Sequence, residues 1–436
     1  MNNFTKNSAL TIGTQGAIFV IGLITSVVIA RVLGPEGKGI YALTTFLPFI
    51  LLYFMNFGLG HAAVYLIAKK DYPREVIVGN NLILMLFHSL IALIVGIGMV
   101  KYFHGGLLPS VGKNYLYLSL VLIPSLLIFS IILPIQLGLQ NIGRYNILQL
   151  SSPFLFLVLI PVLLFYTGDK IIGTLTAYII AVTVIGLIIV FSVIRVCGRP
   201  VFKINKDYIA KVYTYGIKFN ISSILLFLNQ RVNVVIINWF MNPAMVGLFT
   251  LSTGLAEKIW LVADGISTVL FPKLSSLNED TKRNNFTSLV FKTTVLVVSM
   301  ICFILFLLGK LIIVLLFSDS FLGSVEPFRI LLIGVIASSG LRIIESDFKG
   351  RGRPELVSMI MLISFIIMII GSLTLIPIFQ LLGAAYAMVA ANICALIFAI
   401  VMYVKVSSTK VRELLIPRKN DFTTLTTALI KSLKDK

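Results

Sequence analysis

Long apolar runs without a charged residue constrain this chain more than any other feature of its sequence. Six of them precede residue 195, and each is at or above the ~20 residues that a helix needs to cross bilayer hydrocarbon. The chain is 58% hydrophobic and 12% charged, whereas soluble domains carry about 25% charged residues. An all-α, polytopic membrane protein is therefore predicted. The first six spans are predicted at 7–30, 39–68, 76–100, 114–143, 145–168 and 171–194.

Six more apolar runs follow a basic segment, which gives twelve predicted transmembrane helices in all. Lys and Arg recur through this segment beside Pro200, and we interpret it as a linker between two six-helix bundles. The later spans are predicted at 211–240, 245–274, 286–309, 325–348, 355–377 and 383–405. The predicted organisation is an N-terminal six-helix bundle at 1–196, a cytoplasmic basic linker at 197–210, a C-terminal six-helix bundle at 211–405 and a basic cytoplasmic tail at 406–436.

A Gly/Pro hinge between the first two spans returns about half the chain later. The matching pairs are Pro35 and Pro243, Gly39 and Gly247, Gly143 and Gly352, and Gly173 and Gly383, at offsets of 208, 208, 209 and 210. Each match alone is weak, because Gly and Pro mark turns everywhere. Their constant order and offset indicate two similar halves, and we assign Gly34, Pro35 and Pro243 as hinge residues.

Lysine and arginine are distributed unevenly between alternate loops. With the N-terminus inside, the inner segments hold 24 of them and the outer segments 6, which predicts that both termini are cytoplasmic. Six spans per half is an even number, so both halves enter the membrane in the same sense. Such parallel repeats are related by an axis along the membrane normal and can open a central cavity to one side and then the other. In the tail, Leu425, Leu429 and Leu433 recur at helical spacing, which suits an anionic membrane surface.

Several classes of function lack a signal in the sequence. The three cysteines, Cys197, Cys302 and Cys394, have neither metal-site spacing nor the pattern of a disulfide framework. No phosphate-binding glycine-rich loop ending in Gly-Lys-Ser/Thr occurs, which argues against ATP-driven pumping. The formal charge of +19 is explained by topology and not by nucleic-acid binding. We therefore expect no enzymatic activity, cofactor or metal.

Ionisable residues inside the predicted spans distinguish the second half from the first, where only His61 and His88 occur. Each intramembrane charge costs at least ~2.5 kcal/mol at a helix centre, so these groups should face protein or a water-filled cavity. The pairs that share a helix face are Asn220 with Arg231, Glu257 with Asp264, and Arg342 with Glu345. Arg342 and Glu345 stand at i and i+3, so they could also satisfy each other as a structural pair.

Short motifs along the whole chain resemble a known transporter family. They are the Gly13-x-x-Gly16 run, the hinge from Ala30 to Tyr41, the turn Asn56-Phe57-Gly58-Leu59-Gly60, and the loops Gly143-Arg144 and Gly350-Arg351-Gly352-Arg353. In these residues the chain is similar to the polysaccharide flippase branch of the multidrug/oligosaccharidyl-lipid/polysaccharide exporter superfamily. The resemblance implies transfer of an undecaprenyl-pyrophosphate-linked oligosaccharide from the inner to the outer leaflet of a bacterial plasma membrane. Membrane lipids and the polysaccharide polymerase and chain-length machinery are the other partners that it suggests.

The resemblance also suggests roles for the intramembrane residues, because basic groups in such a cavity would receive the pyrophosphate. The candidates for substrate binding are Arg231, Lys218, Lys258, Arg342 and Asn220. Protonation or sodium binding at a buried carboxylate could bias the exchange between states. The candidates for ion coupling are Asp264, Glu257 and Glu345. A multidrug or cation antiporter, or a lipid II-type flippase of the same superfamily, is the alternative; a cation antiporter would need an acidic or aromatic cavity.

Overall fold

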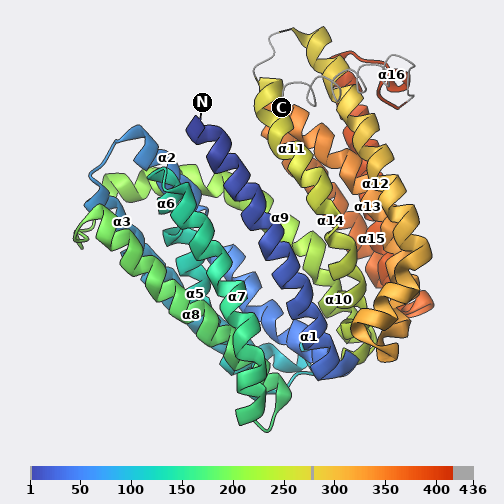
Figure 1. Ribbon diagram of the computed structural model, residues 1–436, viewed down its shortest axis with the longest axis horizontal. Coiled ribbons are helices and arrows are strands. Elements are labelled where there is room, and N and C mark those ends of the chain that lie inside the picture. The colour runs from blue at the N-terminus through green and yellow to red at the C-terminus, as the bar shows by residue number, and fades with distance from the viewer. Residues whose placement is uncertain (1, 276–278, 416–436) are drawn as a thin grey trace. The chain divides into compact units, whose positions relative to one another are not determined.

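The protein is almost entirely helical in the computed structural model, which describes residues 2–275 and 279–415 (Figure 1). No strand occurs among these residues. Their contacts define two compact units, called here unit 1 (Met1–Thr250 with Ile313–Leu322) and unit 2 (Leu251–Ile312 with Gly323–Lys436). Eleven helices in the described part are long and apolar enough to cross a membrane. The predicted all-α, polytopic fold class is confirmed.

The first helix, α1 (Asn2–Met55), is long enough to cross a membrane twice. Counted as two crossings, it makes the eleven helices equivalent to twelve spans. Its apolar part, Leu10–Met55, has 46 residues and would measure about 69 Å if straight. That is more than twice the ~30 Å of bilayer hydrocarbon. The helix is interrupted at Gly34, whose φ of 65° and ψ of −176° suit glycine and are costly for other residues. Pro35 follows, where a new helical segment can begin without a donor.

Unit 1 packs both arms of α1 against α7 and α8. Ile29 of the first arm lies in an apolar cluster with Ile160 of α7 and Ala181 of α8. Such contacts stabilise the association of helices in a membrane through close van der Waals packing. The other helices of this unit are α2 (Leu59–Lys69), α3 (Arg74–Leu107), α4 (Lys113–Leu120), α5 (Leu122–Leu127), the π-helical η1 (Ile128–Ile132), α6 (Ile135–Gly138), α7 (Ile142–Tyr166), α8 (Lys170–Cys197), α9 (Lys206–Phe240) and the first part of α10 (Pro243–Glu257).

Unit 2 is built around α15, which packs against α13 and α14. One face of α15 carries Ala384, Ala387, Ala391 and Ala395, all of them buried. Small side chains at helical spacing let neighbouring helices approach closely inside a membrane. The helices of this unit, beside the end of α10, are α11 (Trp260–Ser275), α12 (Asp280–Phe317, whose last turn belongs to unit 1), α13 (Val325–Gly350), α14 (Pro354–Phe379), α15 (Leu381–Ser407) and α16 (Val411–Leu415). The 3-10 helix η2 (Asp319–Ser324) belongs to unit 1 as far as Leu322.

Three predicted spans are interrupted in the structure. The fourth, predicted at 114–143, is divided into α4, α5, η1 and α6. The second span breaks between α1 and α2, where Phe57 has a φ of 47°, and the eighth breaks between α10 and α11 at Lys258 and Ile259. The turn at Asn56–Gly60 was recognised in the sequence, whereas the break at Lys258 was not predicted. The break in the second span coincides with Gly58, whose φ of 67° favours glycine.

The predicted linker at 197–210 is a short loop followed by the start of α9, since only 198–205 lie outside helices. Asn80 of α3 holds this loop: its side chain donates to the Lys203 carbonyl at 3.1 Å and accepts from the Asn205 amide at 2.9 Å. The boundary between the two compact units lies after residue 250 and not at this linker. The division into two bundles at the linker therefore stays a prediction. In the predicted tail, Leu425, Leu429 and Leu433 lie outside the described residues.

Candidate functional site

A cavity of about 460 Å³ lies within unit 1, between the two arms of α1 and α9. Hydroxyl and amide side chains make up much of its polar lining, together with two cations. No Asp or Glu occurs among the described residues that line it. The lining side chains that can form hydrogen bonds are Thr25, Ser26, Lys38, Tyr41, Thr45, Tyr53, Gln230, Arg231 and Thr250.

The two cations come from different helices. Arg231 of α9 lines the cavity. The sequence analysis placed this residue on a helix face, shared with Asn220, that was expected to face a cavity. Lys38 comes from the second arm of α1, is only 8% exposed, and has its Nζ atom 3.3 Å from Ser26 Oγ of the first arm. The lining is therefore suited to an anionic group.

Aromatic rings form one wall of the cavity. The Phe227 ring of α9 stacks between two rings of α1, with centroid distances of 5.8 Å to Phe46 and 4.5 Å to Tyr53 and interplanar angles of 23° for both. About two turns before Phe227 on α9, the buried Asn220 side chain donates to the Tyr53 carbonyl at 3.2 Å. Asn220 thus joins α9 to α1 beside the cavity and is not among its lining residues.

Lys38 was missed by the sequence analysis, which placed it in an outer loop of the hinge. The structure resumes the helix directly after Gly34, so Lys38, Tyr41 and Thr45 stand at i, i+3 and i+7 on one face. This spacing was available in the sequence. A loop assignment for the Gly/Pro stretch concealed it.

The remaining predicted cations lie elsewhere. Lys258 occupies the break between α10 and α11, where its amide donates to the Leu255 carbonyl at 3.3 Å, and Glu257 ends α10. Lys218 lies in α9, and its side chain is outside the described part of the structure. Arg342 is in unit 2 and belongs to a different cluster.

Arg342 of α13 forms an ion pair with Asp264 of α11. Its guanidinium group also lies 4.8 Å from the centre of the Trp260 ring, a cation–π contact. The suggested self-satisfied pair of Arg342 and Glu345 is therefore wrong, since the carboxylate that Arg342 binds comes from another helix. One substrate-binding candidate and one ion-coupling candidate neutralise each other in this state.

Glu345 is 7% exposed, and its Oε1 atom has no hydrogen-bond partner among the described residues. In the same helix, Asp347 is fully buried but well satisfied: it accepts from Thr287 Oγ1 at 2.8 Å and from Arg351 Nε. Arg351 also donates to Asn284 Oδ1. Asp347 therefore faces protein and joins the end of α13 to α12.

The matching hinge segments of the two halves pack against each other. A Cβ atom placed on Gly39 would lie 1.7 Å from the Pro243 carbonyl oxygen, and one on Gly247 would lie 1.8 Å from the Pro35 carbonyl oxygen. These two contacts are equivalent under the 208-residue offset, as a two-fold relation between repeats requires. Beside them, Arg31 donates from Nε to the Leu316 carbonyl at 2.7 Å and from Nη2 to the preceding carbonyl at 2.5 Å.

Comparison with known proteins gives the family. A family model described as "Polysaccharide biosynthesis protein" matches residues 4–278, more than half of the chain. The chain belongs to the polysaccharide biosynthesis protein family. No curated protein matched it in a sequence comparison. The match includes the hinge, the cavity and the α10–α11 break, so the lining residues of this polysaccharide biosynthesis protein lie within the matched region.

Solved structures share the fold of this polysaccharide biosynthesis protein. It is similar to an inward-facing multidrug resistance MATE family transporter of the MOP superfamily, with a TM-score of 0.75, 16% identity and coverage of 90% of this chain and 94% of that one. It is also similar to the lipid II flippase MurJ in an inward closed conformation, with a TM-score of 0.72, 16% identity and coverage of 98% and 93%. At these identities the likeness establishes the transporter fold alone.

Proposed function

We propose that this protein is a flippase that carries an undecaprenyl-pyrophosphate-linked oligosaccharide from the inner to the outer leaflet of a bacterial plasma membrane, for surface polysaccharide synthesis. The observation that carries the proposal is the cavity with Lys38 and Arg231 and no acidic group among its described lining residues. The family supports the polysaccharide pathway. In this proposal both termini are cytoplasmic.

The chemistry of the cavity suits the diphosphate of such a substrate. Phosphate oxygens accept charge-assisted hydrogen bonds, and a guanidinium group can donate two of them side by side. Lys38 adds a second positive charge from the opposite helix, and nearby hydroxyls can replace water around the first sugar. The polyprenyl tail need not leave the hydrocarbon. Only the head must be sheltered from it.

Exchange between states would use the crossing of the two hinge segments. Gly39 and Gly247 let these segments come into close contact at the Pro243 and Pro35 carbonyls, and Gly34 redirects the chain just before them. Arg31 adds two hydrogen bonds to backbone carbonyls at the end of α12. If one half rocks against the other about this crossing, the cavity changes the side to which it opens. Proton or sodium binding at Glu345, Asp264 or Glu257 would bias the exchange by neutralising a carboxylate, and of these three only the Glu345 side chain is buried.

A cation antiporter is less compatible with this cavity. A cationic drug would meet Lys38 and Arg231 without a carboxylate to bind it, since the described lining includes none. Like charges at close range cost free energy in a low-dielectric site. The aromatic wall alone would have to compensate, through contacts with Phe227 and its two neighbours.

Genetic complementation tests the proposed function. Deletion of the gene from its host should abolish surface polysaccharide and leave lipid-linked oligosaccharide in the inner leaflet. The wild-type gene should restore the polysaccharide, and Arg231→Ala should fail to do so at equal expression. Asp264→Asn tests the coupling role separately. Full restoration by Arg231→Ala and Asp264→Asn would show that the site is wrongly assigned, and unchanged polysaccharide in the deletion strain would refute the flippase function.

A further inference from the structure

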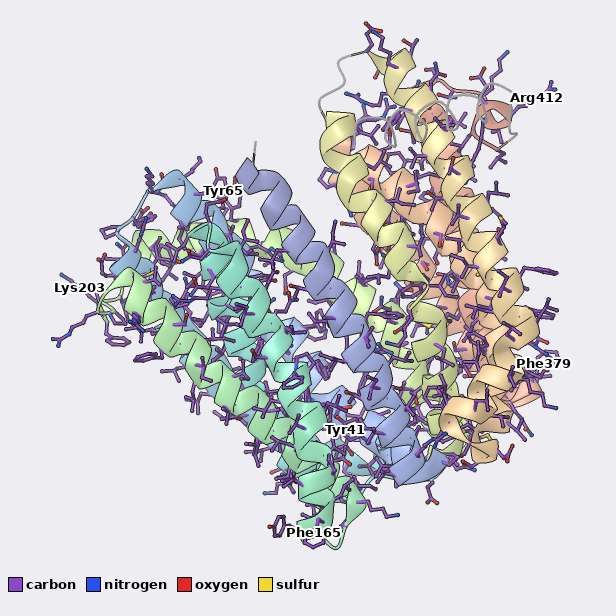
Figure 2. The ribbon with its side chains drawn as sticks, in the orientation of Figure 1. Tyr41, Tyr65, Phe165, Lys203, Phe379 and Arg412 are labelled. Carbon is purple, nitrogen blue, oxygen red and sulfur yellow. The ribbon has the colours of Figure 1, made fainter. Side chains whose placement is uncertain are left out.

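Two tyrosines stack on each other at one end of unit 1. The rings of Tyr65 on α2 and Tyr215 on α9 have centroids 4.1 Å apart and an interplanar angle of 20°. Tyr215 is 38% exposed. Tyr65 lies at the end of the unit opposite Phe165 (Figure 2). This end carries Lys69, Lys70 and the loop to α3, which the distribution of basic residues predicts to be cytoplasmic.

A lysine is positioned beside the pair. Lys69 Nζ lies 4.8 Å from the centre of the Tyr65 ring, in a cation–π contact. His61, Tyr65 and Lys69 stand at i, i+4 and i+8, so they share one face of α2. His61 and Lys69 are exposed. This face of α2, with the Tyr215 ring of α9 stacked on it, therefore presents aromatic rings together with groups that can donate hydrogen bonds.

Two elements connect the tyrosine pair to the cavity: α9, and α2 as the continuation of α1. On α9, Tyr215 lies about 24 Å from Arg231 at 1.5 Å rise per residue. On the other element, α2 continues the second arm of α1, which supplies Tyr53 to the cavity wall. An extended oligosaccharide of several sugars covers such a distance. A substrate with its diphosphate at Arg231 could thus extend its glycan to the tyrosines.

We propose that Tyr65, Tyr215 and Lys69 form a second subsite, which binds the glycan of the lipid-linked oligosaccharide on the cytoplasmic side. The inference rests on the proposed function. The apolar C–H face of a sugar ring packs on an exposed aromatic ring, and hydroxyl or carboxylate groups of the sugar accept hydrogen bonds from Lys69. The cavity selects the diphosphate that all such substrates share, and the tyrosine subsite contacts the variable part.

The arrangement differs from that of a membrane-anchoring aromatic residue, which inserts singly at the lipid interface. Tyr102 on α3 provides the comparison within this chain. It is 73% exposed and has Lys101 Nζ 5.2 Å from its ring centre. It lies at the opposite end of α3 from Arg74, on the side predicted to be outer. Tyr102→Leu is therefore a matched control for removing an exposed tyrosine beside a lysine.

Binding measurements in nanodiscs of zwitterionic lipid test the subsite. The two probes are lipid-linked oligosaccharide extracted from the host and undecaprenyl pyrophosphate without a glycan. The Tyr65→Leu/Tyr215→Leu variant should bind the glycan-bearing probe about tenfold more weakly and the bare pyrophosphate as wild type does. Tyr215→Phe, which keeps the ring, and Tyr102→Leu should bind both probes normally. Arg231→Gln should weaken both.

Each contrary result has a definite meaning. Equal binding of both probes by the double-leucine variant and wild type would overturn the glycan subsite and leave the cavity unaffected. The same two probes would also be measured in nanodiscs that contain phosphatidylglycerol. If the double-leucine variant bound both probes more weakly than wild type in those nanodiscs only, the tyrosines would be a membrane anchor and the proposal would be wrong. If wild type bound neither probe, the proposed function itself would fail.

Discussion

Replacing Gly247 by alanine should open the crossing of the two hinge segments. The added Cβ atom would lie 1.8 Å from the Pro35 carbonyl oxygen, whereas real Cβ atoms stay beyond 3.0 Å, so the backbones must separate by about 1.2 Å at least. A backbone carbonyl cannot rotate away as a flexible side chain can. Overpacking of this kind costs about 1–3 kcal/mol.

Gly254→Ala is the matched control, because Gly254 lies in the same helix and its Cβ would meet no described atom within 4 Å. Both variants gain the same helix propensity of about 1 kcal/mol, so it cancels in the comparison. Unfolding by SDS in mixed micelles should place Gly247→Ala about 1–3 kcal/mol below Gly254→Ala. Adding Gly39→Ala should cost less than the sum of the single changes, since one separation relieves both contacts. Equal stability of Gly247→Ala and Gly254→Ala would refute the close crossing.

Two further predictions concern other charged groups. Asp347→Ala should lower the free energy of unfolding by about 3–5 kcal/mol, because it leaves the buried Arg351 guanidinium without its buried partner. In contrast, Asp280→Ala, which removes a 72% exposed partner of the same arginine, should cost at most about 1 kcal/mol; similar losses for both would contradict the buried cluster. Burial tends to raise the pKa of Asp169, but hydrogen bonds from Tyr115 and from the amides of the first turn of α8 outweigh it and hold the pKa below its usual value. Its stabilising effect is therefore present above the unfolded pKa and lost as the pH falls through the folded pKa. Wild type should be more stable than Asp169→Ala by about 1 kcal/mol at pH 7 and by less at pH 3; the same difference at both pH values would contradict this.

Local sequence patterns were sufficient for the spans and for the turn at Gly34. A charge-free apolar run specifies a crossing, because the bilayer requires about 20 such residues in a helix. The repeated Gly/Pro pattern also predicted two similar halves, and the reciprocal packing of Gly39 and Gly247 agrees with that repeat. Each of these features depends on residues close in sequence or on a repeat visible in it.

The partners of the charged residues could not be predicted in the same way. Helical periodicity gives the face of a residue but not the neighbouring helix. It suggested Glu345 on the same helix as one possible partner of Arg342 and could not show Asp264 on α11. Lys38 was assigned to a loop, because Gly and Pro were read as ending the helix when they only redirect it. The break at Lys258 has no Gly or Pro beside it, so the apolar pattern of this span did not reveal it.

Transport of the lipid-linked oligosaccharide in proteoliposomes tests the central claim most directly. The protein would be reconstituted with labelled substrate, and the fraction that reaches the opposite leaflet would be measured for wild type, Arg231→Gln, Lys38→Gln and the control Lys310→Gln, whose lysine is exposed on α12. If Lys38 and Arg231 hold the diphosphate, each cavity variant should be at least about tenfold slower, the loss of one charge-assisted hydrogen bond, and Lys310→Gln should match wild type. Wild-type rates in both cavity variants would contradict the account.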